Sequence, residues 1–316
     1  MQVIDKINKA LREGRTLFTF ELLPPLKGEG SGRIFNAIDP LMEFGPSYIN
    51  VTFHREDVVE EKGARHLVRR RPGTVGISAA IERRYGVDVV PHLICGGLSR
   101  YDIEDSLIDM DFLGINNVLA LRGDNMKGYN TFEPHPEGHR HATELVAQIR
   151  DMNNGRFIDG QVEQCRLGGR FCVGVAGYPE KHAEAASMEE DIANLKRKVD
   201  AGADYVVTQL SFDNAKILSF IERCREAGIV VPIIPGIKPL STKSQLTVLP
   251  EIFGAEIPAG LVAEASKCKD NAAVRELGVE WAVAQAQGLK KAGLPVLHFY
   301  TMGRSDSMSQ IARRVF

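Results

Sequence analysis

Short apolar runs rich in β-branched residues alternate with amphipathic segments along the whole chain. Repeated alternation of this kind predicts βα units that build a parallel sheet, and eight such units suffice for one closed barrel. We therefore predict an α/β fold, a single (β/α)8 TIM-type barrel that forms one domain over residues 1–316. The eight predicted strands cover residues 16–22, 48–53, 87–94, 117–121, 171–177, 205–210, 230–237 and 295–301.

The helix after the fifth strand has the clearest signals. Ser187 can cap its first turn, and Glu190 stands three residues later, as in a capping box. The apolar positions that follow recur at helical spacing, and the helix should end at residues 201–203. Residues 102–112 and 214–225 show similar amphipathic patterns. Two stretches, near 125–140 and 153–170, are polar and rich in Gly, and we predict longer loops there.

Charge and composition exclude several classes of function. The 316 residues carry 39 basic and 41 acidic side chains, for a formal charge of −2, which offers no broad surface for nucleic acid or an anionic membrane. The N-terminus mixes charged residues with apolar ones, unlike a signal peptide or a membrane span, so we expect a cytoplasmic protein. Five widely spaced cysteines are expected to be reduced thiols, although Cys165 and Cys172 could form a redox or metal pair.

Polar and titratable side chains follow nearly every predicted strand. Active-site groups of a (β/α)8 barrel come from the carboxyl ends of the strands and the loops after them, so these side chains should meet in one pocket. They are Glu21, Thr52, His54, His92, Arg122, Asp124, Tyr178, His182, Gln209, Lys238, Tyr300 and Arg304.

Two carboxylates in this set suggest acid–base chemistry. Glu21 lies among apolar residues before two prolines, and burial of that kind raises the pKa of a carboxyl group toward the range of a general acid. Asp124 follows the fourth strand in the segment LRGD, so one carboxyl group could stay protonated while the other stays charged. The alternatives are a structural ion pair for Glu21 and an ordinary acidic turn for Asp124.

Other motifs give weaker signals. His135, His139 and His141 lie with Glu133 and Glu137 in a loop without a recognised metal-ligand spacing, so we predict no metal site there. The glycine-rich segments lack the register of a Rossmann motif, and no Walker lysine motif is present. A nucleotide cofactor, if one binds, would therefore lie on the barrel.

Several segments together resemble a known family. They match the bacterial 5,10-methylenetetrahydrofolate reductase family in order and over nearly the whole chain. The segments are FTFELLPP at 18–25, YINVTF at 48–53, PHLICGG at 91–97, LALRGD at 119–124, VAGYPEKHAEA at 175–185, NLKRKVDAGADYVVTQ at 194–209, VPIIPGIKPLST at 231–242 and HFYTMGRS at 298–305.

The resemblance implies a chemistry and its ligands. A member of this family holds FAD without a covalent bond, takes a hydride from NADH or NADPH, and reduces 5,10-methylenetetrahydrofolate to 5-methyltetrahydrofolate for methionine synthesis. The expected partners are therefore the folate and the nicotinamide nucleotide, and we also expect a homo-oligomer. The chain departs from the family's pattern at residues 257–263, which contain no aromatic side chain that could stack on the substrate.

The resemblance also implies roles for individual residues. Glu21 matches the general acid that opens the imidazolidine ring, Asp124 the carboxylate that stabilises the resulting cation, and Gln209 a folate-binding amide. The remaining matches are flavin contacts (Thr52, His92, Leu121, Arg122, Ala176, Tyr178 and His182), groups near the flavin's ribose and pyrophosphate (Asp191, Asn194, Arg197 and Lys198), and substrate contacts of the last unit (Tyr300 and Arg304).

Two other readings of the residues stay open. The barrel could bind a pterin or a flavin without turnover, in which case Glu21 and Asp124 would be structural. It could also be another flavin barrel, of the proline dehydrogenase kind.

Overall fold

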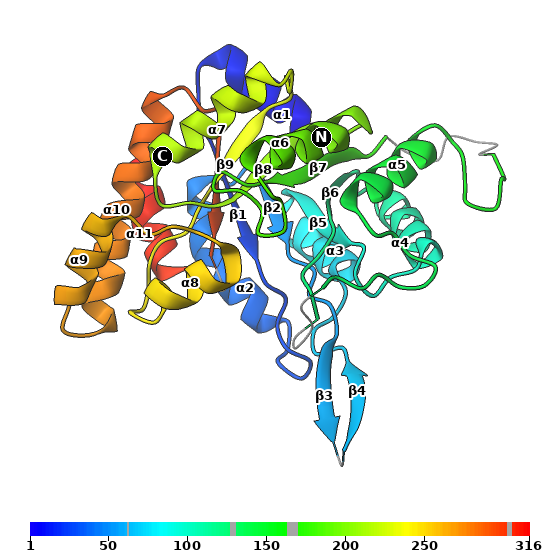
Figure 1. The fold of residues 1–316 in the computed structure, drawn as a ribbon, viewed down its shortest axis with the longest axis horizontal. Helices are drawn as coiled ribbons and strands as arrows, with labels where there is room; N and C mark the ends of the chain where they lie inside the picture. Colours follow the sequence, from blue (N-terminus) through cyan, green and yellow to red (C-terminus); the bar gives the residue numbers. More distant parts are fainter. Residues whose placement is uncertain (62, 127–130, 163–169, 302–304) are drawn as a thin grey trace.

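The computed structural model describes residues 1–61, 63–126, 131–162, 170–301 and 305–316. In this part of the chain, eight parallel strands close into a barrel in the order β1-β10-β9-β8-β7-β6-β5-β2 (Figure 1). The predicted (β/α)8 barrel is confirmed, because each predicted run contains one of these strands. They are β1 (Leu17–Leu22), β2 (Tyr48–Val51), β5 (Asp88–Ile94), β6 (Asn117–Leu121), β7 (Cys172–Gly177), β8 (Tyr205–Leu210), β9 (Ile233–Ile237) and β10 (Val296–Tyr300).

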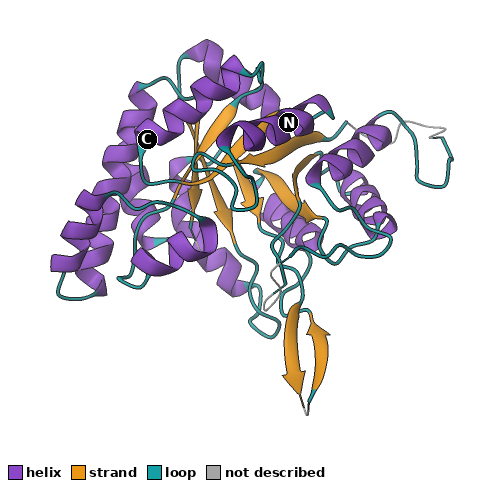
Figure 2. Cartoon of the chain, in the orientation of Figure 1, coloured by secondary structure: helices purple, strands orange, loops and turns teal. Residues whose placement is uncertain are grey.

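Helices cover the outside of the barrel (Figure 2). The helix predicted after the fifth strand is α6, and the hydroxyl of Ser187 accepts a hydrogen bond from the backbone N–H of Glu190, as predicted. The carboxylate of Glu190 accepts a hydrogen bond from the N–H of Ala186 and not from that of Ser187. The prediction of the second hydrogen bond of the capping box is therefore wrong. The helices are α1 (Val3–Glu13), α2 (Gly32–Ile38), the 3-10 helix η1 (Asp39–Phe44), α3 (Thr74–Tyr85), α4 (Arg100–Phe112), α5 (Ala142–Asn153), α6 (Met188–Asp200), α7 (Asn214–Glu226), α8 (Gln245–Phe253), α9 (Ala259–Lys267), α10 (Asn271–Lys291) and α11 (Asp306–Val315).

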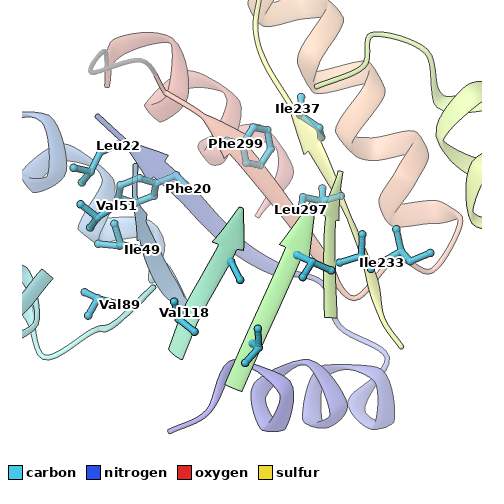
Figure 3. Packing of buried hydrophobic residues seen from close by; sticks show 14 of the residues in the cluster. Phe20, Leu22, Ile49, Val51, Val89, Val118, Ile233, Ile237, Leu297 and Phe299 are labelled. Atoms are coloured by element: carbon cyan, nitrogen blue, oxygen red, sulfur yellow. The ribbon is translucent and has the colours of Figure 1, made fainter. Parts of the chain in front are cut away.

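Alternate residues of each strand build two different cores. Outward-facing side chains such as Phe20, Ile49 and Leu297 are buried in the main hydrophobic cluster, between the sheet and the helices (Figure 3). Inward-facing side chains at the amino ends of the strands form a second cluster, which includes Leu17 and Tyr48. Successive side chains of a strand point to opposite faces, so residues two positions further along also face the barrel axis.

The amino end of the barrel, which we call the closed end, is sealed by apolar side chains. Val3 and Ile7 of α1 belong to the same buried cluster as the inward-facing residues at this end. Tyr205 fills the space beside Gly174, where a Cβ atom would lie 2.5 Å from the tyrosine ring. The closed end is therefore a packed core, and among the described residues it leaves ligands no access to the barrel interior.

A β-hairpin absent from the prediction projects from the body of the protein. Strands β3 (Asp57–Glu61) and β4 (Ala64–Val68) pair antiparallel, and Figures 1 and 2 show them extending away from the barrel. Glu56 and Arg69 form an ion pair of 2.7 Å at the base of the hairpin. Most of the hairpin is exposed, including Leu67, so it adds little to the hydrophobic core.

The two predicted loops fall partly outside the described residues, which exclude 127–130 and 163–169. Their described flanks are irregular, apart from one bridge between Arg156 and Val162. Among the described cysteines, Cys95, Cys172 and Cys224 are buried free thiols and Cys268 is a half-buried one. The suggested pair of Cys165 and Cys172 cannot be placed, because Cys165 is outside the described residues.

Candidate active site

One cavity of about 1160 Å³ lies at the carboxyl end of the barrel, which we call the open end. Fifteen of the sixteen residues that the sequence analysis assigns to a site line this cavity, and the sixteenth, Arg304, is outside the described residues. The fifteen are Glu21, Thr52, His92, Leu121, Arg122, Asp124, Ala176, Tyr178, His182, Asp191, Asn194, Arg197, Lys198, Gln209 and Tyr300.

Glu21 is held at the inner wall of the cavity by three side chains. It is the penultimate residue of β1, and its side chain is 16% exposed. The hydroxyl of Thr52 donates a hydrogen bond of 2.8 Å to Glu21 Oε1. On the other oxygen, Oε2, the Nε2 atoms of His92 and His298 lie at 3.7 Å and 3.5 Å. The carboxylate therefore faces two imidazoles and one hydroxyl.

These neighbours reverse the predicted change in the acidity of Glu21. Burial raises the pKa of the carboxyl group, but His92, His298 and the hydrogen bond from Thr52 together outweigh it, and the net pKa is lower than that of an ordinary glutamate. Burial lowers the pKa of His92 to about 4, so its imidazole is neutral at neutral pH. The prediction of a raised pKa for Glu21 is therefore wrong for the protein without ligands.

Asp124 enters the same cavity from the turn after β6. Gly123 adopts a left-handed backbone conformation (φ +86°), which suits a residue without a side chain at this tight turn. A guanidinium nitrogen of Arg55 donates a hydrogen bond of 2.9 Å to the backbone oxygen of Asp124. Two carboxyl groups, from β1 and from the turn after β6, thus line one space, as the sequence analysis expected.

The wall formed by β7 and α6 is rich in cations. Lys198 donates a hydrogen bond to the backbone oxygen of Ala176, and burial lowers the pKa of its ammonium group to about 8. Asp191 is buried and accepts a hydrogen bond of 2.9 Å from the N–H of His182. Arg197 is bonded to Asn194 on the same helix. A half-buried ammonium group and a guanidinium group that line the same cavity are suited to binding a phosphate or diphosphate.

The adjoining wall, from β8, β9 and β10, offers amide, hydroxyl and aromatic groups. The Gln209 amide oxygen accepts a hydrogen bond of 2.8 Å from the N–H of Leu210, and the Tyr300 hydroxyl donates one of 2.7 Å to the Thr208 backbone oxygen. Lys238, which the sequence analysis placed at this end of the barrel, is buried and lines the cavity. Phe253 of α8 also lines it.

Sequence reasoning missed several residues of the site. Phe253 supplies an aromatic ring close to the segment 257–263, where the sequence showed none. Arg55 was missed because it follows an ordinary-looking strand end, and His298 because it stands in the middle of a strand. His298 could have been found from its spacing, since it precedes Tyr300 by two residues and therefore faces the same side of β10.

The histidine-rich loop does not form a metal site in the described residues, where no group of three or more His, Cys, Asp or Glu side chains could hold an ion. His139 is buried and hydrogen-bonded to Gln148, and His141 lines the cavity. None of the helices in the described part of the chain combines the length and apolarity that a bilayer span requires.

The fold and the cavity define an α/β-barrel protein with a ligand site at the carboxyl ends of its strands. Comparison with known families identifies it further: the profile of the methylenetetrahydrofolate reductase family matches residues 6–315. The chain belongs to the methylenetetrahydrofolate reductase family.

Two relatives show the extent of the similarity. The chain is 33% identical to 5,10-methylenetetrahydrofolate reductase of Escherichia coli K12 over 305 residues, which cover 96% of this chain and 92% of that protein. It is also 33% identical to methylenetetrahydrofolate reductase (NADH) 1 of Arabidopsis thaliana, over 97% of this chain and 49% of that protein. The chain thus spans about half the length of the plant relatives it matches.

A solved structure has the same fold. An uncharacterised protein from Clostridium thermocellum that binds two copies of 5-methyl-5,6,7,8-tetrahydrofolic acid superimposes with a TM-score of 0.58, over 98% of each chain. The two sequences are 12% identical, so this likeness concerns the fold alone.

Proposed function

We propose that this protein is a flavin-dependent reductase that converts 5,10-methylenetetrahydrofolate to 5-methyltetrahydrofolate with NADH or NADPH as the electron donor. The observation that carries the proposal is the position of Glu21, held by Thr52, His92 and His298 inside the cavity of a chain that belongs to this family. The named activity of the Escherichia coli relative, which matches over nearly its full length, supports the same conclusion.

The residues of the cavity fit FAD as the cofactor. Lys198 is a half-buried ammonium group whose pKa is lowered by partial burial, and a diphosphate beside it would compensate this cost. Arg197, Asn194 and Asp191 of α6 lie on the same wall and would hold the ribose and the pyrophosphate. Thr52, His92, Leu121, Arg122, Ala176, Tyr178 and His182 would contact the rest of the flavin.

The protein's own contribution is to place charge and protons around the folate. When bound, FAD would supply the redox chemistry, the transfer of a hydride from the nicotinamide to the methylene carbon. Glu21 donates a proton to the nitrogen that leaves when the imidazolidine ring opens. Asp124 supplies a negative charge that stabilises the iminium cation formed on the folate. Gln209, Tyr300 and Arg304 bind the substrate, and the two substrates occupy one cavity in turn.

An anaerobic experiment tests the two halves of the reaction separately. We expect the purified protein to be yellow, to be bleached by NADH or NADPH, and to regain its colour when methylenetetrahydrofolate is added. A bleached flavin that the folate fails to reoxidise would contradict the substrate assignment and favour another flavin barrel. A colourless protein that takes up no FAD would favour a binding protein without turnover.

A further inference from the structure

A layer of polar side chains lies inside the barrel, between the closed end and Glu21. Tyr48, Val90 and Val296 belong to the apolar cluster of the closed end. The residue two positions further along each of these strands faces the same axis. These residues are Asn50, His92 and His298, which we call the polar layer, and each is at most 2% exposed.

The polar layer has unused hydrogen-bonding capacity. Among the described residues, the ring nitrogens of His92 and His298 and both amide atoms of Asn50 have no hydrogen-bond partner. Buried polar groups in folded proteins are nearly always satisfied, by protein or by ordered water. Three such side chains directly beneath a proposed acid therefore call for an explanation beyond packing.

The two histidines approach the same oxygen of Glu21 from strands on opposite sides of β1. His298 comes from β10, which pairs with β1, and His92 comes from β5, two strands away on the other side. Burial, together with the nearby His298, lowers the pKa of His92 to about 4, so His92 is the neutral member. Of the two imidazoles, that of His298 also lies closer to Glu21 Oε2, at 3.5 Å against 3.7 Å.

We propose that Glu21 and His298 share the single proton that is delivered to the folate, with His298 as the positioning residue that passes this proton to Glu21, from which it goes to the folate nitrogen. This inference rests on the proposed function. Before delivery the pair holds one proton more than a carboxylate and a neutral imidazole. Afterwards that proton is on the folate nitrogen, both groups of the pair are unprotonated, and the charge lost by the pair equals the charge gained by the substrate.

This arrangement reconciles the acidity of Glu21 with its role. A carboxyl group with a lowered pKa is mostly ionised at neutral pH, and alone it would be a poor acid. A proton held on the adjacent imidazole remains available to it through a short shift between the two groups. The negative charge left on the pair after delivery then lies beneath the newly formed iminium cation.

The closed end fixes the route by which the pair regains its proton. The layer beneath the polar layer is packed under α1, and its two hydroxyls, those of Tyr48 and Tyr205, are buried without a hydrogen-bond partner, so no hydrogen-bonded path leads to solvent in that direction among the described residues. The proton must return through the cavity at the open end. In each catalytic cycle, Glu21 and His298 would thus regain their proton when the cavity is open to water, after one substrate has left and before the next one binds.

The other charged or titratable groups that face this pair come from several elements. Tyr300 of β10 packs edge-on against the His298 ring, with 5.1 Å between ring centres. Lys238 follows β9, Tyr178 follows β7, and Asp124 follows β6; all three line the same cavity. Thr52, which follows β2, donates a hydrogen bond to the other oxygen of Glu21, and its hydroxyl does not titrate near neutral pH.

The first test uses the protein without FAD and therefore does not depend on catalysis. Histidine ring signals are followed by NMR between pH 4 and 9 in the wild type and in Glu21→Gln, with His298 assigned from the spectrum of His298→Gln. We expect the titration midpoint of His298 to fall by at least one pH unit in Glu21→Gln, because the carboxylate that stabilises the imidazolium is gone. An unchanged midpoint would overturn the proposal.

The second test measures the pH profile of each half-reaction by anaerobic stopped flow. In His298→Gln we expect the alkaline limb of the pH profile of folate reduction to move toward acid by at least one pH unit. The rate of folate reduction at pH 8 should therefore fall at least tenfold, while the rate of flavin reduction by the nicotinamide is unchanged. His139→Gln, which also removes a buried histidine but one that does not line this cavity, is the matched control and should leave both profiles unchanged.

The outcomes separate this inference from the proposed function. An unshifted folate profile in His298→Gln would overturn the shared proton even if the reductase activity is confirmed. If the wild type shows no folate reduction, the proposed function fails, and the NMR experiment still decides whether Glu21 and His298 hold a proton together. Should His298→Gln fail to fold, the His298 signal is assigned from the other histidine variants and the midpoint in Glu21→Gln decides alone.

Discussion

The two ends of the barrel interior are built from the same strands and differ sharply in chemistry. Along β1 the inward-facing residues run from Leu17 through Thr19 to Glu21, and along β10 from Val296 through His298 to Tyr300. The closed end is an apolar core packed under α1, whereas the open end is a cavity lined by acids, bases and cations. In both of these strands the residue at the closed end is apolar and the two inward-facing residues that follow it are polar, so polarity increases from the closed end to the open end.

This gradient separates the requirements of stability from those of chemistry. Apolar side chains at the closed end contribute to folding through burial. At the open end, partly desolvated charged groups such as Lys198 oppose folding unless a ligand compensates them. The contrast therefore predicts that substitutions at the open end alter binding and catalysis, and that those at the closed end alter the free energy of unfolding.

The largest effect is expected for Glu21→Gln at the open end. The amide cannot donate the proton that opens the folate ring, so folate reduction should slow by about 10²- to 10⁴-fold, while flavin reduction by the nicotinamide is retained. Anaerobic stopped-flow measurement of both half-reactions checks this expectation. Normal rates in both would remove Glu21 from the mechanism.

Lys198→Met should weaken FAD binding roughly tenfold to a hundredfold, because it removes a charge-assisted hydrogen bond of about 1.5–3 kcal/mol. The ammonium group has a pKa of about 8 in the free protein, so wild-type affinity for FAD should fall as the pH rises above 8. That pH dependence should be absent from the variant. Fluorescence titration of FAD into the apoprotein between pH 6 and 9.5 measures both effects.

Lys196→Met is the matched control for this variant. Lys196 lies on the same helix but pairs with Asp200, and it does not line the cavity. Equal losses of affinity in the two variants would show that the net charge of α6, and not Lys198 itself, determines binding.

A smaller effect is expected for Asp124→Asn. Loss of the negative charge should slow folate reduction by roughly tenfold, equivalent to about 1.4 kcal/mol, and should shift the flavin potential to a more positive value. Asp105→Asn, on the exposed surface of α4, serves as the control. A potential and a rate that both match the wild type would show that Asp124 is an ordinary turn residue.

The smallest effect is expected at the closed end. The Tyr205 hydroxyl is buried without a hydrogen-bond partner in the described part of the chain, so Tyr205→Phe should change the free energy of unfolding by no more than about 1 kcal/mol, in the direction of greater stability. Tyr300→Phe, at the open end, removes a hydroxyl that donates to Thr208 and should be destabilising. Urea unfolding of both apoproteins measures the difference.

The barrel was predictable from the sequence because its strands are buried on both faces. Runs such as 205–210 and 117–121 are nearly continuous in apolar residues, and the turns between units carry clear helix caps such as Ser187. The hairpin β3–β4 was not predictable in this way. Its strands are mostly exposed and rich in charge, so they lack the hydrophobic pattern by which a strand is recognised.

The site was predictable only in part. Residues at the ends of strands, such as Asp124 and Gln209, could be assigned because the fold brings all strand ends to one cavity. The direction of the pKa shift of Glu21 could not be predicted, because it depends on His298, which is 277 residues away along the chain. The burial of Glu21 could be inferred from its apolar neighbours in sequence. The closure of the barrel brings His92 and His298 to it, and their effect on its pKa outweighs that of burial.

The projecting hairpin has a practical consequence for handling the protein. Because its backbone is held by few contacts beyond its own pairing, we expect limited proteolysis to cut first near Gly63, where the two strands turn. Glu56 and Arg69, which form an ion pair at the base, lie on either side of that point in the sequence. The nicked chain should therefore stay assembled. A fluorescent label attached at Leu67 would then report on the hairpin while the barrel remains intact.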